Sequence, residues 1–552
     1  MNIIRPASCL ILLIVLLVLA GRPAVRAQTP IFDRQDTLRG AVTPERAWWD
    51  LTYYHLQIRV NPADSSIQGL NTVQYRVLEP RQKLQLDLQP PLRIEKVQQK
   101  GRDLAFNRDG NVYYIQLQEK QQVGTQHQLE VFYSGKPRVS ENPPWSGGFT
   151  WKQDRRGQPF VATSCQGDGA SLWWPCKDHM YDEPDSMQIS VTVPGHLTEV
   201  SNGRLRKVDQ NADGSRTFHW AVTNPINNYG VNVNIGDYVS FSEKYAGEKG
   251  PLDCQYYVLR ENLEKAKKQF TQVPLMLKAL EHWFGPYPFY ADSYKLVEVP
   301  YLGMEHQSSV TYGNKYQNGY LGKDLSGTGW GLKFDFIIIH ESGHEWFANS
   351  ITYKDIADMW LHESFTAYSE NLYLDYHFGK KAAAEYVIGT RKNIQNDRPL
   401  IGVYQVNYAG SGDMYYKGAN MLHTLRQIVN DDEKWRQILR GLNKTFYHQT
   451  VTSRQVEQYL SRQVGRDLKP FFNQYLRDVR IPRLAYSLKN NRLQYRWVNT
   501  VAGFTMPVRV YLNKQEHWLE PTTAWQELPA LPAKAKLSLD PNFYVGLEQV
   551  RR

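Results

Sequence analysis

The chain has 552 residues, of which 41% are hydrophobic and 22% are charged. This composition is typical of globular proteins and excludes a largely disordered chain, and the length predicts three to four domains at about 150 residues each. The sequence has no fixed-period repeat or heptad pattern, which excludes solenoids and coiled coils. The net charge of +10 is mild for this length, and basic runs such as 265–268 have helical spacing, so we expect solvated helix faces and no nucleic-acid partner.

Residues 1–27 are predicted to be a signal peptide. Arg5 precedes an apolar stretch from Cys9 to Ala20, and Val25-Arg26-Ala27 is a small-residue site that predicts cleavage before Gln28. The apolar stretch is shorter than the roughly 20 residues of a membrane span. We therefore expect an exported protein, periplasmic or secreted, with no stable membrane insertion after leader removal. A leader retained as a membrane anchor is the alternative.

Three cysteines remain after the leader: Cys165, Cys176 and Cys254. Three cysteines cannot form a disulfide scaffold, and they lack the paired spacing of a structural zinc site. We expect buried apolar thiols, and a single Cys165–Cys176 bridge stays open as an alternative.

The region 28–243 has the residue alternation of a β-sheet. Leu56, Ile58 and Val60 alternate with polar residues, and the runs 84–88 and 187–193 repeat this pattern. A period of two with one apolar face indicates half-buried antiparallel strands, and the turn-forming residues between the runs are typical of hairpins. The sequence therefore predicts an N-terminal antiparallel β domain.

The region 244–480 is predicted to be rich in helices. Leu263, Ala266 and Phe270 keep helical spacing as far as Pro274, where the helix is expected to kink or restart. A strand is predicted at 294–299. Four further helices are predicted, and the last opens with Thr452 and Gln455 in capping-box spacing. The four ranges are 332–348, 360–377, 416–429 and 453–465.

The alternation of apolar and polar residues that is typical of strands returns in the region 481–552. Two apolar runs flank Asn490-Asn491, which predicts a hairpin, and a third strand follows at 508–512. About 70 residues suffice for a small β-sandwich. The predicted fold class is therefore multidomain α+β, with the order β, α-rich, β and no long C-terminal helical domain.

The segment His340-Glu341-Ser342-Gly343-His344 is the main candidate for a functional site. On a helix, residues at i and i+4 lie on one face, so both imidazoles can bind one zinc ion. Glu363 follows His344 by 19 positions on the next predicted helix and is the expected third ligand. Three protein ligands leave a fourth position open, which is typical of catalytic zinc. Zinc activates water and polarises a carbonyl, and Glu341 is placed to act as general base.

The motif His-Glu-x-x-His-x-Trp-Phe-x-Asn, running from His340 to Asn349, and the later Trp360-Leu361-His362-Glu363 resemble the aminopeptidase N-like family of gluzincin zinc peptidases. That family also has leukotriene-hydrolysing members. Pro175-Cys176-Lys177-Asp178 and Phe284-Gly285-Pro286-Tyr287-Pro288 are similar to further family segments, so the resemblance covers most of the chain. It implies a thermolysin-like catalytic domain, one Zn²⁺ per chain and peptide substrates with a free N-terminus.

The resemblance also implies roles for individual residues. Gly303, Met304 and Glu305 match the family's Gly-x-Met-Glu-Asn motif, in which Glu305 would bind the substrate's α-ammonium group. Gln166 matches a residue that binds the same amine from the N-terminal domain. Tyr415, preferred over Tyr416 on the Tyr-x-Lys-Gly pattern, would hydrogen-bond the developing oxyanion.

Several positions depart from the family pattern. His306 replaces an Asn, Leu302 replaces a Gly, and His362 replaces an Asn just before the third ligand. His362 is an alternative metal ligand, although paired helices should point Glu363 inward. Asp358 is a candidate partner for a ligand imidazole, with helix capping as the other interpretation.

The favoured hypothesis is a zinc aminopeptidase that hydrolyses the N-terminal peptide bond. A thermolysin-type endopeptidase shares the ligand set but should lack an amine anchor, so Glu305 argues against it. A catalytically silent binding relative is a third hypothesis, which the complete ligand set disfavours. Epoxide hydrolysis stays a minor option.

Overall fold

The computed structural model describes residues 31–529 and 535–551. Asp33–Arg552 forms one compact unit. The predicted leader, 1–27, and its cleavage site lie outside the described residues. Within the described part, no helix combines the length and the apolarity that a membrane crossing requires.

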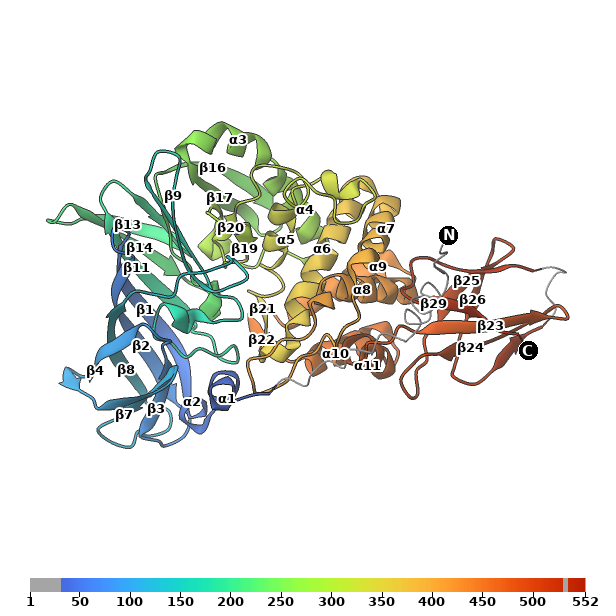
Figure 1. Ribbon diagram of the computed structural model, residues 1–552, viewed down its shortest axis with the longest axis horizontal. Helices are drawn as coiled ribbons and strands as arrows, with labels where there is room; N and C mark the ends of the chain where they lie inside the picture. Colours follow the sequence, from blue (N-terminus) through green and yellow to red (C-terminus); the bar gives the residue numbers. More distant parts are fainter. Residues whose placement is uncertain (1–30, 530–534, 552) are drawn as a thin grey trace, which may run out of the picture. The chain divides into compact units, whose positions relative to one another are not determined.

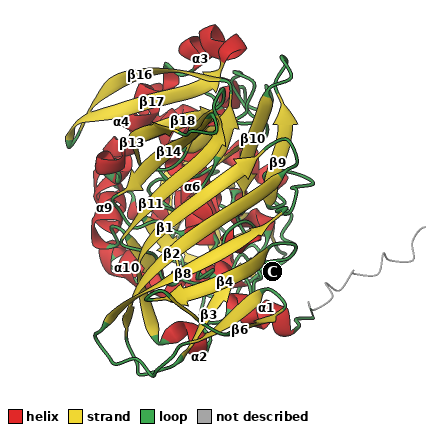
Figure 2. Cartoon of the chain, turned by 90° about the vertical axis from the view of Figure 1, so that its left-hand side faces the viewer, coloured by secondary structure: helices red, strands yellow, loops and turns green. Residues whose placement is uncertain are grey.

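The N-terminal region is built around an eight-stranded sheet, seen face-on in Figure 2. Two short helices, α1 (Arg34–Gly40) and α2 (Pro44–Ala47), precede it. The antiparallel prediction holds for most neighbours but is wrong for the central pair β1 and β11, which run parallel, with Leu56 opposite Ile189. In spatial order the strands are β13 (Arg204–Gln210), β14 (Ser215–Val222), β11 (Ser186–Pro194), β1 (Trp49–Asn61), β2 (Ser66–Val77), β8 (Gln126–Gly135), β4 (Arg93–Gln99) and β5 (Arg102–Asp103).

Two smaller sheets complete this region. The first contains β3 (Lys83–Asp87), where the predicted alternation of buried and exposed residues is wrong, because Gln85 and Asp87 are buried as well. Asp87 is buried because it forms an ion pair with the equally buried Arg46 of α2. The first sheet contains β3, β7 (Val112–Gln116) and β6 (Phe106–Asp109). The second contains β12 (Thr198–Val200), β15 (Asn234–Gly236), β10 (Pro159–Ser164) and β9 (Gly148–Gln153).

A fourth sheet, with five strands, begins the region that carries the predicted zinc ligands, here called the catalytic region. The predicted domain boundary at 243/244 lies inside the first strand of this sheet, β16. Because β16 pairs along its whole length with β17, the chain enters this sheet at Tyr238. The short strand β19 lies at the sheet edge. In spatial order the strands are β16 (Tyr238–Gly247), β17 (Gly250–Leu259), β18 (Tyr294–Glu298), β20 (Val310–Tyr312) and β19 (Gly303–Met304).

The helices of the catalytic region pack beside this sheet (Figure 1). The helix expected at 332–348 is shorter, because Asp335 caps its first turn and the chain leaves the helix after Gly343. The restart near Pro274 and the capping box at Thr452 are confirmed. Helices α7, α9 and α11 of this region were not predicted from the sequence. The helices are α3 (Leu263–Gln269), α4 (Gln272–Phe284), α5 (Phe336–Gly343), α6 (Trp360–Phe378), α7 (Lys380–Gly389), α8 (Tyr416–Val429), α9 (Asp432–Thr445), α10 (Ser453–Val464) and α11 (Lys469–Arg477).

The C-terminal region forms two small sheets, as the sandwich prediction requires. Asn490 and Asn491 both have positive φ, which is the conformation of a two-residue hairpin turn. One sheet contains β27 (Gln526–Leu528), β24 (Arg492–Val498), β23 (Arg483–Lys489) and β29 (Gly546–Gln549); the other contains β26 (Gln515–Leu519), β25 (Val508–Leu512) and β28 (Leu537–Leu539).

Two hydrophobic cores organise the compact unit. One fills the N-terminal β region, and the other runs through the helices into the C-terminal sheets. Val297, Val299, Tyr301 and Met304, from β18 to β19, belong to the N-terminal core although they lie in the catalytic region. The edge strand β19 is therefore fixed where the two regions meet.

Candidate metal centre and active site

Helix α5 carries the two predicted histidine ligands. Asp335 accepts hydrogen bonds from the backbone N–H groups of Ile337 and Ile338, which fixes the start of the helix. His340 lies in its last turn and His344 is its C-cap residue, so the rings lie one turn apart with their centroids separated by 5.0 Å. Both histidines are buried.

Helix α6 brings Glu363 to the same point. Its Oε2 lies 3.8 Å from His340 Nε2 and 3.5 Å from His344 Nε2. Ligand atoms on tetrahedral zinc with bonds of about 2.0–2.1 Å are separated by about 3.4 Å, so both distances from Glu363 are close to those that zinc requires. All three ligand atoms lie within 4.8 Å of one another. Glu363 Oε2 is buried and has no hydrogen-bond partner in the described structure. A buried carboxylate oxygen without a partner between two imidazoles fits a metal ligand.

The ionisation of Glu363 also fits this role. Burial raises the pKa of its carboxyl, but the neighbouring His344 and His340 outweigh burial and hold the pKa well below its ordinary value. The carboxylate form, which binds zinc, is therefore the form present at neutral pH.

Each ligand imidazole is oriented through its other nitrogen. His340 Nδ1 lies 2.7 Å from Glu370 Oε1, and Glu370 also accepts a hydrogen bond from the Tyr386 hydroxyl. His344 Nδ1 donates to the backbone oxygen of Phe347 at 3.0 Å. These contacts orient the two rings so that both Nε2 atoms face Glu363 Oε2, where a metal ion would bind.

The interpretation of Asp358 as an imidazole partner is wrong. Its carboxylate accepts hydrogen bonds from the backbone and side chain of Ser453 and from the Tyr404 hydroxyl, so it stabilises the start of α10. The carboxylate that pairs with a ligand imidazole is Glu370 instead. It lies seven residues after Glu363, two helical turns along the same face, and this spacing is the signal that the sequence analysis overlooked.

Glu341 faces the same cavity as the ligands. It is buried, and oxygen or nitrogen atoms of Glu341, Glu305 and His344 lie within 4.8 Å of one another. Burial, partly offset by His340, raises the pKa of Glu341 to about 7. A carboxyl that exchanges protons near neutral pH is suited to general acid–base catalysis.

Glu305 and Gln166 meet beside the metal ligands. Gln166 follows β10 of the N-terminal region, and its Nε2 lies 2.7 Å from Glu305 Oε1 and 3.0 Å from Glu363 Oε1. Both amide hydrogens are thus donated to carboxylates, and the amide oxygen is left as an acceptor. The buried Glu305 carboxylate and the Gln166 amide therefore lie together beside the metal ligands.

The backbone before Glu305 lies against the metal helix. A Cβ on Gly303 would come within 2.6 Å of the Ile337 side chain, so only glycine lets β19 approach α5 this closely. Met304 is buried in the N-terminal core and fixes the end of the strand. The Glu305 side chain is thereby held next to Glu341 and His344.

Two residues that the sequence analysis did not place in this role support Glu305. The Tyr229 hydroxyl donates to Glu305 Oε1 at 3.1 Å and lies 3.5 Å from His362 Nδ1. His362 Nε2 accepts the backbone N–H of Tyr353 at 3.0 Å, so this nitrogen is engaged away from the metal cluster. His362 is therefore a partner of Tyr229, and the alternative of a metal ligand is wrong.

His306, the other departure from the family pattern, is also buried. Its two ring nitrogens lie 3.3 Å from the Gly230 oxygen and 3.2 Å from the Thr163 oxygen, both in the N-terminal region. The residue after Glu305 therefore anchors this strand end to the N-terminal region.

The structure distinguishes Tyr415 from Tyr416. The Tyr415 ring stacks on His340 with centroids 5.9 Å apart. Burial and the carboxylates of Glu363, Glu305 and Glu341 raise the pKa of Tyr415. Burial and the carboxylate of Glu370 raise the pKa of Tyr416. Tyr415 is thus the tyrosine beside the metal cluster.

The three metal ligands, Glu341, Glu305, Gln166 and Tyr415 line one cavity of about 620 Å³, a volume typical of small-ligand sites. Its polar end holds the histidines and carboxylates described above. The rest of the wall is mainly apolar, and Trp145, which is 63% exposed, lies at its edge. The apolar lining residues are Leu302, Met304, Leu325, Phe336, Ile337 and Met359.

The three cysteines take no part in this site. Cys165, Cys176 and Cys254 are buried and carry free thiols, as expected, and no Cys165–Cys176 bridge is formed. Burial raises the pKa of Cys254 to about 12, so it stays a thiol at neutral pH.

Comparison with known families assigns both large regions. Residues 51–229 match the Peptidase M1 N-terminal domain, and residues 269–475 match the Peptidase family M1 domain. The chain belongs to peptidase family M1. The M1 match includes His340, His344 and Glu363, which places the metal cluster in the family's catalytic domain.

Individual M1 relatives are distant. Endoplasmic reticulum aminopeptidase 1 from Mus musculus is 26% identical over 53% of this chain and 32% of its own length. Leukotriene A-4 hydrolase from Xenopus laevis is 24% identical over 76% of this chain and 68% of its own length. This chain thus spans about half or less of several curated relatives, including Probable aminopeptidase 1 from Saccharolobus solfataricus, at 52% of its length.

A solved M1 zinc metallopeptidase from Deinococcus radiodurans, a variant bound to a Tyr-Ser-Ala substrate, has the same fold. Its TM-score is 0.65 at 21% identity, covering 78% of this chain and 95% of that one. This likeness confirms the predicted multidomain α+β architecture.

Proposed function

We propose that the chain is a zinc-dependent aminopeptidase that hydrolyses the N-terminal peptide bond of peptides. The observation that carries the proposal is the Glu305–Gln166 pair beside the three-ligand cluster of His340, His344 and Glu363. The buried Glu305 carboxylate, with the Gln166 amide beside it, matches an ammonium group and disfavours an acetylated one. Their closeness to the cluster supports cleavage one residue from the amine.

His340, His344 and Glu363 would hold the zinc ion, which when bound supplies an activated water and a polarised substrate carbonyl. Glu341 takes a proton from the attacking water and passes it to the leaving amine, so the carboxylate is regenerated in each turnover. The Tyr415 hydroxyl donates a hydrogen bond to the oxygen that becomes negative when water adds to the carbonyl carbon. Glu305 and Gln166 bind the α-ammonium group and block longer N-terminal extensions.

The substrates of the named relatives support this proposal. Several relatives are named aminopeptidases, and the Deinococcus radiodurans variant was solved with a tripeptide. We also propose export to the periplasm or the exterior, on the basis of the leader sequence alone. N-terminal sequencing of protein expressed with its full leader tests this, and an intact Met1 would contradict it.

A panel of aminoacyl anilides, free and N-acetylated, with and without chelator, tests the activity. The proposal expects zinc-dependent hydrolysis of free substrates only. Cleavage of blocked peptides at internal bonds would favour a thermolysin-type endopeptidase, and binding without any hydrolysis would favour a silent relative.

The Glu341→Gln variant tests the general base. We expect it to keep stoichiometric zinc but lose about 10²–10⁴-fold in kcat, because glutamine cannot accept the proton from water. Metal analysis and kinetics on the same preparation measure both quantities. Near-normal turnover with bound zinc would refute this role.

A further inference from the structure

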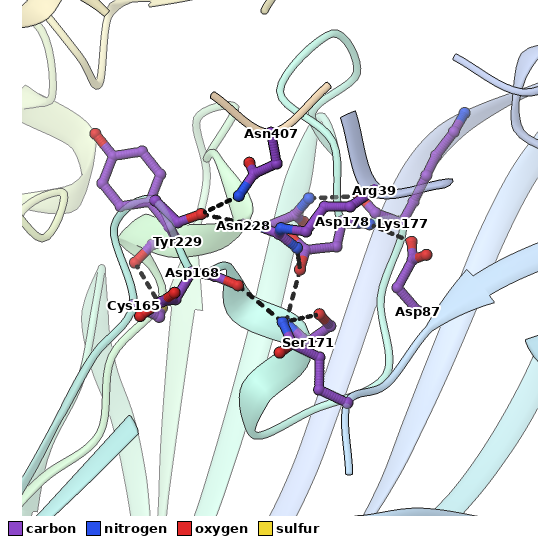
Figure 3. A network of polar contacts seen from close by, with 12 residues as sticks. Arg39, Asp87, Cys165, Asp168, Ser171, Lys177, Asp178, Asn228, Tyr229 and Asn407 are labelled. Atoms are coloured by element: carbon purple, nitrogen blue, oxygen red, sulfur yellow. Dashed lines mark hydrogen bonds and ion pairs between the residues drawn. The ribbon is translucent and has the colours of Figure 1, made fainter. Parts of the chain in front are cut away.

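The residue that follows Gln166 is held by side chains from two distant parts of the chain. The backbone oxygen of Gly167 accepts a hydrogen bond from Arg39 Nη2 at 3.3 Å and from Asn407 Nδ2 at 2.9 Å. Arg39 belongs to α1, ahead of the first sheet, and Asn407 belongs to a loop of the catalytic region between α7 and α8. Figure 3 shows both side chains reaching the turn that contains Cys165 and Asp168.

This turn determines where the Gln166 side chain points. It is closed by a hydrogen bond from the Gly169 N–H to the Cys165 oxygen at 2.7 Å, and Gly167 and Gly169 both have positive φ. A Cβ on Gly169 would lie 2.0 Å from Arg39 Nη2, so the guanidinium packs directly on the turn. The Arg39 guanidinium therefore contacts the backbone next to Gln166.

Arg39 is itself fixed from the other side. Its Nη1 forms a 2.5 Å ion pair with Asp178 Oδ2, and the two side chains are only 16% and 7% exposed. Asp178 also accepts the Ser171 N–H at 3.0 Å, which ties the ion pair to the end of the same loop (Figure 3).

Asn407 reaches the turn through a loop that touches the end of α1. A Cβ on Gly40 would lie 2.2 Å from the Val406 backbone, so α1 and this loop are in close contact. The loop is closed by a bridge between Val403 and Tyr408. Three chain segments thus meet at one carbonyl oxygen.

We propose that Arg39 and Asn407 are positioning residues for the amine-binding subsite. By holding the Gly167 oxygen, they fix the direction of the Gln166 amide, whose two hydrogens go to Glu305 and Glu363 and whose oxygen is left for the substrate's ammonium group. This inference rests on the proposed aminopeptidase function. It assigns part of amine recognition to the first described helix of the chain.

A double-mutant cycle tests this proposal. Losing Gln166 should raise the KM for free aminoacyl anilides by about 2- to 10-fold, which is the typical effect of one hydrogen bond. Arg39→Ala should raise KM to a similar extent with kcat less affected. In the Gln166→Ala background, Arg39→Ala should cause no further rise, because it acts through the amide that is already missing.

The control is Arg34→Ala, which removes another arginine of α1 that pairs with Asp109 and is 62% exposed. It should leave KM at the wild-type value. Asn407→Ala repeats the cycle from the catalytic region and carries the test if Arg39→Ala does not fold.

The proposal is overturned if the single variants keep the wild-type KM, or if their effects on KM add fully to that of Gln166→Ala. Absence of any hydrolysis by the wild-type enzyme would instead refute the proposed function.

Discussion

The metal end and the amine end of the site are built in different ways. The metal ligands come from two consecutive helices, α5 and α6, and lie within 24 positions of the sequence. The amine end joins Gln166, Tyr229 and Glu305, and the first and last of these are 139 residues apart. One end depends on local helix geometry, whereas the other depends on how the N-terminal β region packs on the catalytic region. The two ends should therefore respond differently to substitution.

The largest effect is expected at the metal end. Glu363→Ala removes the third ligand, so we expect loss of bound zinc and of measurable hydrolysis, together with a lower Tm because metal stabilises the folded state. Metal analysis and thermal unfolding measure both. His362→Asn is the matched control, since His362 bonds Tyr353 and Tyr229 instead of the cluster, and it should retain zinc. Zinc loss in the control alone would reverse the ligand assignment.

Tyr415→Phe tests the contact at the reacting carbonyl. Loss of one hydrogen bond to a developing oxyanion typically lowers kcat by about 10²–10³-fold, and we expect that range with zinc content unchanged. Tyr416→Phe, one residue along, should keep kcat within a few-fold. Equal losses in the two variants would contradict the assignment.

Glu305→Ala tests the amine end on its own. Truncating one member of a buried charge pair typically costs about 2–5 kcal/mol, so kcat/KM for free substrates should fall at least about 30-fold. N-acetylated substrates lack the ammonium group and should stay poor substrates, so the preference for free over N-acetylated substrates should shrink. If that preference is unchanged, Glu305 does not bind the amine and the contrast between the two ends disappears.

Glu370→Gln should have the smallest effect of this series. Replacing the partner of a ligand histidine typically weakens metal binding by about 10–100-fold, and His340 Nδ1 lies 2.7 Å from Glu370. Zinc titration against a competing chelator measures the affinity. With saturating zinc, kcat should return towards the wild-type value, and failure to recover would show a role beyond the metal.

Helical periodicity predicts the pairing of the two histidine ligands, whereas the position of Glu363 also depends on how α6 packs against α5. His340 and His344 share a face in any helix, and Glu370 shares one with Glu363 by the same rule, although it was overlooked. Tyr229 and the role of His362 could not be predicted, because their meeting depends on contacts between residues 133 positions apart. Likewise, the alternation of apolar and polar residues predicts the strands β1 and β11. It does not predict that they pair in parallel, because chain connectivity determines this.

The most direct test is a crystal structure of the protein with zinc and a slowly hydrolysed peptide analogue. The account predicts one zinc ion on His340 Nε2, His344 Nε2 and Glu363, with the analogue's free amine bound by Glu305 and Gln166. Zinc bound elsewhere, or an amine directed away from Glu305, would contradict the central claim.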